Sequence, residues 1–181
     1  MLIPYAMQFI YNEKSHSFVS SSFVTIFIGV LFILANLDKE FKLNLKQTFL
    51  FSTLAWLMVA IFGSLPFILS PQEFTFSEAF FESMSGITTT GATVITDLDN
   101  SPKSILLWRA IMQWLGGIGI IVMATTVLPL LKVGGMQLFK LDSSGTEKIL
   151  PKTVEVSFLI ITIYTTLTFA CAFVYWIQGM N

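Results

Sequence analysis

The sequence predicts an all-α integral membrane protein, built of transmembrane helices and one shorter, re-entrant helix that is followed by a polar loop. Composition is the first indication: the 181 residues are 54% hydrophobic and 12% charged, whereas soluble domains carry about 25% charged residues. The mean hydropathy of +0.76 is the second. The third is the presence of four apolar stretches that reach the length of about 20 residues needed to cross a bilayer.

The four long stretches are predicted to be transmembrane helices. They contain no Asp, Glu, Lys or Arg, and they run over 15–37, 47–72, 110–131 and 156–181. Residues 103–109 add two turns before the third stretch. The first eleven residues are apolar but short, and they lack the charged start of a signal peptide. They are interpreted as the tail of a helix whose beginning is absent, which predicts a fragment of a longer protein.

Lysine and arginine residues predict the orientation of the chain. Cytoplasmic loops carry an excess of these residues. If the spans alternate, one side of the membrane receives seven of them and the other side three. The three are Lys14, Lys103 and Arg109, and the seven lie around 39–46 and 132–152. These two regions are therefore expected in the cytoplasm, and the segment 71–102 is expected outside.

A short helix is predicted inside that outer segment. Thr75 followed by Glu78 has the form of a capping box. Four apolar side chains then fall at helical spacing: Phe76, Phe80, Phe81 and Met84. The helix would run over 76–85, about 15 Å at 1.5 Å per residue. Because this is half the thickness of a bilayer, the segment is expected to enter the membrane and return.

The sequence ITTTGAT at 87–93 follows this helix. Its β-branched residues and its glycine disfavour a continued helix, so the chain is expected to leave the helix in an extended form. Backbone carbonyls exposed there could replace the hydration shell of a cation, as in ion-selectivity filters. Gly91 could adopt a backbone conformation closed to other residues. A polar turn between two helices of any membrane protein is the alternative interpretation.

Two charges and three glycines accompany this loop. Glu82 lies one turn before the threonines, and Arg109 begins the next apolar stretch. Because a lone charge at membrane depth is costly, we expect the two to pair and to brace the loop. The following helix contains Gly116, Gly117 and Gly119, which allow either close helix approach or bending.

An enzyme is not predicted. Catalytic sites need paired acids, a cluster of His or Cys, or a nucleophile with a base. The chain has one histidine, His16, and one cysteine, Cys171, and no candidate partner lies near either in sequence. No basic block indicates nucleic-acid binding, and no cofactor is expected.

Three segments resemble a known family: LPFILS at 65–70, AFFESMSGITTTGAT at 79–93, and the run over 109–140 that contains WLGGIG and GGMQL. They closely resemble the TrkH/TrkG potassium-uptake proteins of the Trk/Ktr/HKT superfamily. The resemblance runs through nearly the whole chain. It implies four joined helix–pore-helix–helix repeats around one pore, and an N-terminal fragment that holds only the first of them.

The resemblance also implies how the chain is divided. Residues 1–41 would be the end of an accessory N-terminal helix pair. Residues 42–131 would form the first repeat, with a pore helix at 76–85 and a filter at 88–92. Residues 132–153 would be a cytoplasmic loop, and 154–181 would be the outer helix of an incomplete second repeat.

In the family, backbone carbonyls just before the filter glycine coordinate K⁺. Transferred to this sequence, the resemblance implies K⁺ bound at Thr89 and Thr90, with Gly91 and Thr88 as further ligands. Glu82 and Arg109 would support the loop. The implied function is potassium uptake, with K⁺ as the transported ion. One such strand supplies only a quarter of a ring, so this chain alone is not expected to build the pore.

The resemblance implies partners and a location as well. These are a cytosolic TrkA-type nucleotide-binding regulator, membrane lipid and, in the full-length protein, a second copy in a homodimer. The loop 132–152 would be a docking surface for the regulator. The expected location is the bacterial inner membrane, which the chain would cross several times. The alternative is a non-conducting transporter remnant or a membrane scaffold.

Overall fold

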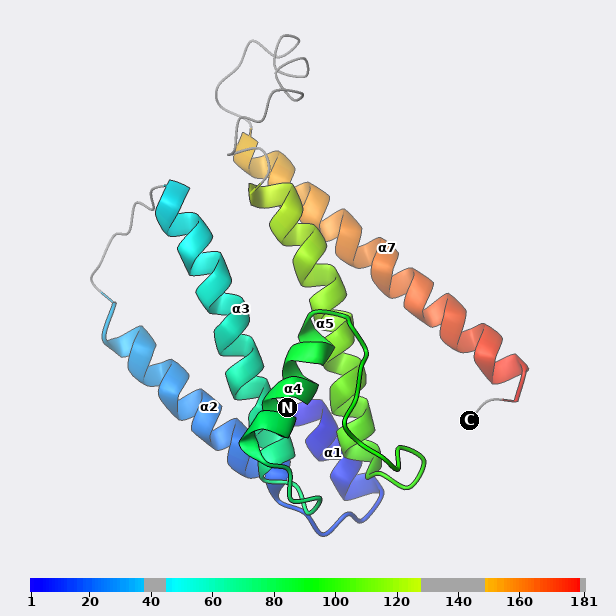
Figure 1. The fold of residues 1–181 in the computed structure, drawn as a ribbon. Helices are drawn as coiled ribbons and strands as arrows, with labels where there is room; N and C mark the ends of the chain where they lie inside the picture. Colours follow the sequence, from blue (N-terminus) through cyan, green and yellow to red (C-terminus); the bar gives the residue numbers. More distant parts are fainter. Residues whose placement is uncertain (38–44, 128–148, 180–181) are drawn as a thin grey trace. The chain divides into compact units, whose positions relative to one another are not determined.

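The computed structural model describes residues 1–37, 45–127 and 149–179, and the regular structure in these ranges is helical (Figure 1). The helices are α1 (Leu2–Ile10), α2 (Ser17–Leu34), α3 (Leu45–Ile68), α4 (Phe76–Ile87), α5 (Lys103–Val127) and α7 (Ile149–Ile177). The chain divides into two compact units, Met1–Gly117 and Ile118–Asn181, which are described separately below.

Within the described parts of the chain, four helices are long and apolar enough to cross a membrane, which confirms the four predicted spans. Their apolar windows are Ser17–Leu34, Lys46–Ile68, Lys103–Met123 and Glu155–Ile177. The third span begins at Lys103, in agreement with the prediction that residues 103–109 add two turns before it. Most of the lysines used to predict orientation lie in 38–44 and 128–148, outside the described residues, so the orientation stays a prediction.

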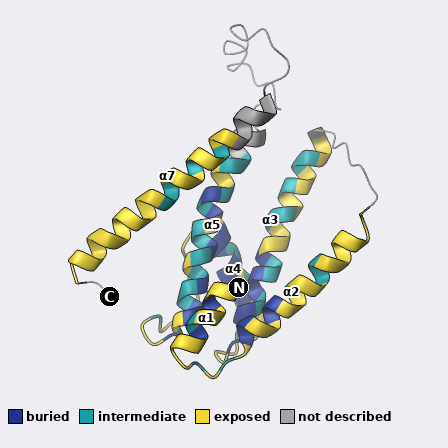
Figure 2. Cartoon of the chain, turned by 180° about the vertical axis from the view of Figure 1, so that it is seen from behind, coloured by how far each residue is buried: buried dark blue, intermediate teal, exposed yellow. Residues whose placement is uncertain are grey.

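The core of the first unit lies where α2, α3, α4 and the first half of α5 meet, and Figure 2 shows buried residues gathered there. Trp108 is buried in this core, where its ring meets Phe18 edge-on at 6.1 Å between centroids. Its indole Nε1 donates to the carbonyl of Gly63 at 2.9 Å. This bond ties α5 to α3, because a buried indole N–H needs an acceptor.

Helix α4 turns a small and polar face to the core, while two of its phenylalanines remain exposed. The buried face consists of Ala79, Glu82, Ser83, Ser85, Gly86 and Ile87. Phe76 is 61% exposed and Phe81 is 44% exposed. Ser83 donates its hydroxyl proton to the carbonyl of Ala60 on α3 at 2.6 Å. Small side chains on this face let the helices approach closely.

The N-terminal end of α5 is held by the segment between α1 and α2. The carboxylate of Glu13 accepts hydrogen bonds from the backbone N–H of Ser104, at 3.3 Å, and from the Ser104 hydroxyl. An acidic group is favoured at a helix N-terminus, where backbone N–H groups lack partners within the helix. This contact joins residues 91 positions apart in the chain.

In the second unit, α7 begins at Ile149, earlier than the outer helix expected at 154. Pro151 is tolerated there because the first turn of a helix does not need its N–H groups. Four threonine hydroxyls of this helix donate to backbone carbonyls one turn earlier, as Ser and Thr commonly do in apolar helices. The donors are Thr162, Thr165, Thr166 and Thr168.

Candidate functional site

The predicted capping box is present at the start of α4. The Thr75 side chain accepts from the N–H of Glu78 at 3.4 Å, and Glu78 Oε2 accepts from the N–H of Thr75 at 2.9 Å. The Thr75 hydroxyl also donates to Glu78 Oε2. The hydroxyl of Thr75, followed by its backbone N–H, holds the pKa of the exposed Glu78 carboxyl below its usual value, because both bonds favour the charged form. The helix start is thus fixed by residues three apart.

The other end of α4 closes in a Schellman motif, and the threonines form it. Helix α4 ends at Ile87, two residues later than predicted, with Thr88 as the C-cap. The N–H of Thr89 donates to Gly86 at 2.9 Å, and the N–H of Thr90 donates to Ser85 at 3.0 Å. These are the two bonds that define the motif. Thr88 and Thr89 therefore form a turn, which corrects the prediction that the chain leaves the helix in an extended form.

The residue in the left-handed position of this motif is Thr89, with φ of +58°. Glycine usually occupies that position, because a Cβ there lies too close to the following carbonyl. The left-handed conformation costs a β-branched residue about 1–2 kcal/mol. Gly91, with φ of +75°, is the second left-handed residue of the loop and adopts the conformation that was expected of it. Strain at Thr89 was not predicted.

The Schellman bonds fix the direction of three carbonyl groups. In a trans peptide the carbonyl of one residue points opposite to the N–H of the next. The N–H groups of Thr89, Thr90 and Gly91 all point back to carbonyls at the end of α4, the last of them to Ser85 at 3.3 Å. The carbonyls of Thr88, Thr89 and Thr90 consequently point away from the helix. All three residues are exposed in this chain.

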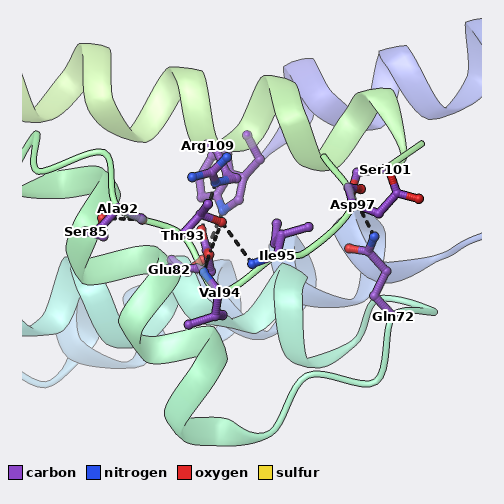
Figure 3. Close-up of polar contacts among 12 residues, drawn as sticks. Gln72, Glu82, Ser85, Ala92, Thr93, Val94, Ile95, Asp97, Ser101 and Arg109 are labelled. Carbon is purple, nitrogen blue, oxygen red and sulfur yellow. Dashed lines mark hydrogen bonds and ion pairs between the residues drawn. The ribbon is translucent and has the colours of Figure 1, made fainter. Parts of the chain in front are cut away.

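The second half of the loop is anchored to buried side chains (Figure 3). Ser85, 6% exposed, donates its hydroxyl proton to the carbonyl of Ala92 at 2.6 Å. Glu82, 1% exposed, accepts from the Thr93 hydroxyl and, at 2.6 Å, from the N–H of Val94. These bonds hold 92–94 against α4.

Arg109 and Glu82 lie together, as the charge argument expected. Arg109 Nε is 2.8 Å from Glu82 Oε2, and the two side chains are 12% and 0% exposed. One carboxylate therefore receives a guanidinium from α5 and two donors from the loop, as Figure 3 shows. A buried carboxylate needs such partners, since burying it unpaired is costly.

Gly116 places the first half of α5 directly against the end of α4. A Cβ built at Gly116 would overlap the carbonyl oxygen of Ile87 and would lie 2.7 Å from its carbonyl carbon. Of the two roles left open for the glycine run, close approach is the one observed at this position. Helix α5 thus supports the loop twice, through Gly116 and through Arg109.

Two loop-holding residues were missed by sequence reasoning, Ser85 and Thr93. Nothing in a single sequence distinguishes them from other serines and threonines. Their partners lie seven and eleven residues away, across the turn.

Among the described residues, no group of three or more His, Cys, Asp or Glu is placed to hold a metal ion. The oxygen atoms that the loop presents are those of its backbone carbonyls and threonine hydroxyls.

Comparison with known proteins gives consistent results. Residues 14–180 match the protein family described as TrkH, cation transport protein. The chain is 40% identical over 186 residues to the Trk system potassium uptake protein TrkH of Escherichia coli, an alignment that covers 100% of this chain and 38% of that protein. It is 34% identical over 185 residues to TrkG of Escherichia coli, covering 99% of this chain and 38% of that protein.

A solved structure is similar as well. The crystal structure of the potassium transporter TrkH from Vibrio parahaemolyticus matches with a TM-score of 0.85 and 37% sequence identity. The match covers 99% of this chain and 36% of that chain. The sequence therefore spans well under half the length of the proteins it matches.

Proposed function

The chain belongs to the TrkH family of cation transport proteins, and from this premise we propose that its loop over 88–92 forms one wall of a potassium-selective filter. In this proposal α4 is a re-entrant pore helix, and α3, α4 and α5 form one of four helix–pore-helix–helix repeats. K⁺ is coordinated by the carbonyls of Thr89 and Thr90, with Thr88 and Gly91 as further ligands. The family is one of transport proteins and not of enzymes.

The observation that carries the proposal is the common direction of the carbonyls of Thr88, Thr89 and Thr90. The N–H groups of the same peptides are bonded to the end of α4, so the carbonyl oxygens are directed away from the helix, where an ion could meet them. Carbonyl oxygens in a row can replace the hydration shell of a cation. The C-terminal end of α4 adds a partial negative charge beside them, which favours a cation and disfavours an anion.

The transport step needs no chemistry in this proposal. A membrane potential supplies about 2.3 kcal/mol per elementary charge for every 100 mV, and the protein supplies the path. Because one loop provides only a quarter of a ring, the remaining ligands come from other parts of the complete protein.

The proposal extends to location and partners through the family. We expect the complete protein in the inner membrane of a bacterium, as a dimer in contact with lipid. A cytosolic TrkA-type nucleotide-binding regulator is the expected partner. The lysine-rich region 132–152, of which 132–148 lies outside the described residues, is the surface proposed for it.

The test is made on the complete reading frame that contains this sequence, expressed in a strain deficient in K⁺ uptake. We expect growth at low K⁺ to be restored, and Gly91→Ser to lower the preference for K⁺ over Na⁺. The φ of Gly91 is +75° and its missing Cβ would meet nothing within 4 Å. Within this chain the substitution therefore acts through the backbone and not through a clash.

Gly29→Ser is the matched control, since Gly29 also has no atom within 4 Å of a built Cβ and lies in α2, away from the loop. Restored growth with an unchanged ion preference in Gly91→Ser would place the filter elsewhere. Failure of the complete protein to restore growth would favour the alternative, a non-conducting remnant or scaffold.

A further inference from the structure

We propose that Ser85 is a positioning residue whose hydroxyl determines where the run of outward carbonyls ends. The inference rests on the proposed function of the loop. It assigns to Ser85 the task of holding the Ala92 carbonyl on the helix side of the chain, so that this carbonyl does not join those of Thr88, Thr89 and Thr90.

Ser85 bonds the loop at both of its ends. Its backbone carbonyl accepts the N–H groups of Thr90 and Gly91, at 3.0 and 3.3 Å. Its hydroxyl donates to the carbonyl of Ala92 at 2.6 Å. The first pair of bonds turns carbonyls outward, and the single hydroxyl bond turns a carbonyl inward. One residue thus sets two opposite peptide orientations only two residues apart.

These two functions of Ser85 can be separated by mutation. Replacement by alanine leaves the backbone carbonyl in place, so the bonds to Thr90 and Gly91 can persist. Only the donor to the Ala92 carbonyl is lost. The peptide between Ala92 and Thr93 is then free to rotate, because Ala92 is exposed and its Cβ is the only side-chain atom it carries.

The neighbouring bonds limit how far such a rotation spreads. Glu82 holds the Thr93 hydroxyl and the N–H of Val94, and the Schellman bonds hold Thr89 and Thr90. Ala92 lies between these two anchored segments. Loss of the Ser85 hydroxyl is therefore expected to change the direction of one carbonyl without releasing the whole loop.

A change of this kind alters ion preference more than transport itself. Selectivity between K⁺ and Na⁺ depends on the number and arrangement of the coordinating carbonyls. An additional carbonyl, that of Ala92, that can turn outward makes the coordination less defined. Ser85 thereby contributes to discrimination between ions without touching the ion.

Ser83 offers a matched control in the same helix. It is also a buried serine, at 0% exposure, and its hydroxyl also donates to a backbone carbonyl at 2.6 Å. Its acceptor, however, is Ala60 on α3 and not the loop. Ser83→Ala therefore loses a similar bond and a similar volume, and it should affect stability without affecting ion preference.

The experiment measures K⁺ and Na⁺ uptake by proteoliposomes that contain the complete protein with Ser85→Ala, Ser85→Cys or Ser83→Ala, each normalised to the amount of folded protein. We expect Ser85→Ala to lower the K⁺-to-Na⁺ ratio about three- to tenfold, the range given by the loss of one hydrogen bond. Ser85→Cys should be intermediate, because a thiol is a weaker donor of similar size. If Ser85→Ala does not accumulate as folded protein, Ser85→Cys alone tests the inference.

The inference is overturned if Ser85→Cys keeps the wild-type K⁺-to-Na⁺ uptake ratio and Ser85→Ala, where it folds, does so too. It is also overturned if Ser83→Ala lowers this ratio as much as the Ser85 variants do. Gly91→Ser, measured in parallel, separates this inference from the proposed function. A changed ratio in Gly91→Ser with unchanged Ser85 variants rejects the role of Ser85 alone. An unchanged ratio in all of them rejects the filter as well.

Discussion

The two ends of α4 are held in different ways. At the first end, Thr75 and Glu78 bond each other across three residues, and both are exposed. At the second end, the bonds reach to Arg109, 27 residues from Glu82, and to Ala60, 23 residues from Ser83. A local motif starts the helix, whereas the packing of α3 and α5 fixes how it ends and where the loop goes.

This difference indicates which end tolerates change. A capping box is remade by any suitable pair at the same spacing, and its loss affects the first turn. The second end combines a buried charge, a close backbone contact and a strained threonine. Substitutions that remove the buried ion pair or the close contact should therefore cost more than loss of the cap, whereas relief of the strain at Thr89 should stabilise, and the following four predictions test this comparison.

Arg109→Gln should have the largest effect, because it leaves the Glu82 carboxylate buried without its guanidinium. Breaking a buried ion pair on one side costs about 3–5 kcal/mol. The measurement is a double-mutant cycle on thermal stability of the complete protein, with Glu82→Gln as the second variant. The double variant should lose much less than the sum of the two single losses. Additive losses would show that the two side chains do not act as a pair.

Gly116→Ala should follow, because its Cβ overlaps the carbonyl group of Ile87. Forcing extra volume into a packed contact costs about 1–3 kcal/mol. Gly29→Ala is the control, since nothing lies within 4 Å of the built Cβ there. Thermal unfolding in detergent should show a lower midpoint for the first variant only. Equal midpoints would mean that α5 does not approach α4 so closely.

Thr89→Gly should act in the opposite direction. Glycine adopts the φ of +58° without strain, so relief of the strain stabilises the folded state by about 1 kcal/mol. Part of this gain is offset, because glycine loses more conformational entropy than threonine when the chain folds. The Thr89 carbonyl is retained, so the K⁺ uptake proposed for the complete protein should continue. A lower unfolding midpoint in the same assay would show that the threonine side chain contributes more than its strain removes.

Thr75→Ala should have the smallest effect, a fall in the unfolding midpoint of about 2–4 °C. Its bonds lower the pKa of Glu78, so their contribution is present above the pKa of Glu78 in the unfolded chain. The contribution is lost as the pH falls through the lowered pKa of the folded state. The difference between wild type and variant should therefore narrow in acid. A difference that grows in acid would contradict the pairing with Glu78.

Much of the fold follows from the sequence because its signals are local. Apolar length alone indicated the four spans, and the spacing of Thr75 and Glu78 indicated the start of α4. The family resemblance is confirmed by the match over 14–180. The charge argument for Glu82 and Arg109 also needed no structure, since each residue had few possible partners in an apolar chain.

The geometry of the loop could not be predicted in the same way. Glycine is the usual left-handed residue after a helix, and the sequence offers Gly91 for that role. The Schellman motif instead uses Thr89, because the last carbonyls of α4 attract the N–H groups of Thr89 and Thr90. Ser85 and Thr93 gain their roles only once this turn has brought 92–94 back to the helix.

The ion pair of Glu82 and Arg109 also bears on how the chain is made. Synthesis proceeds from the N-terminus, so the glutamate leaves the ribosome before its arginine does. In an apolar environment neither charge is tolerated alone. The nascent chain therefore gains by keeping α4 close to water until α5 has been synthesised, and by burying both together. Co-translational insertion of this region should proceed with two helices as a single step.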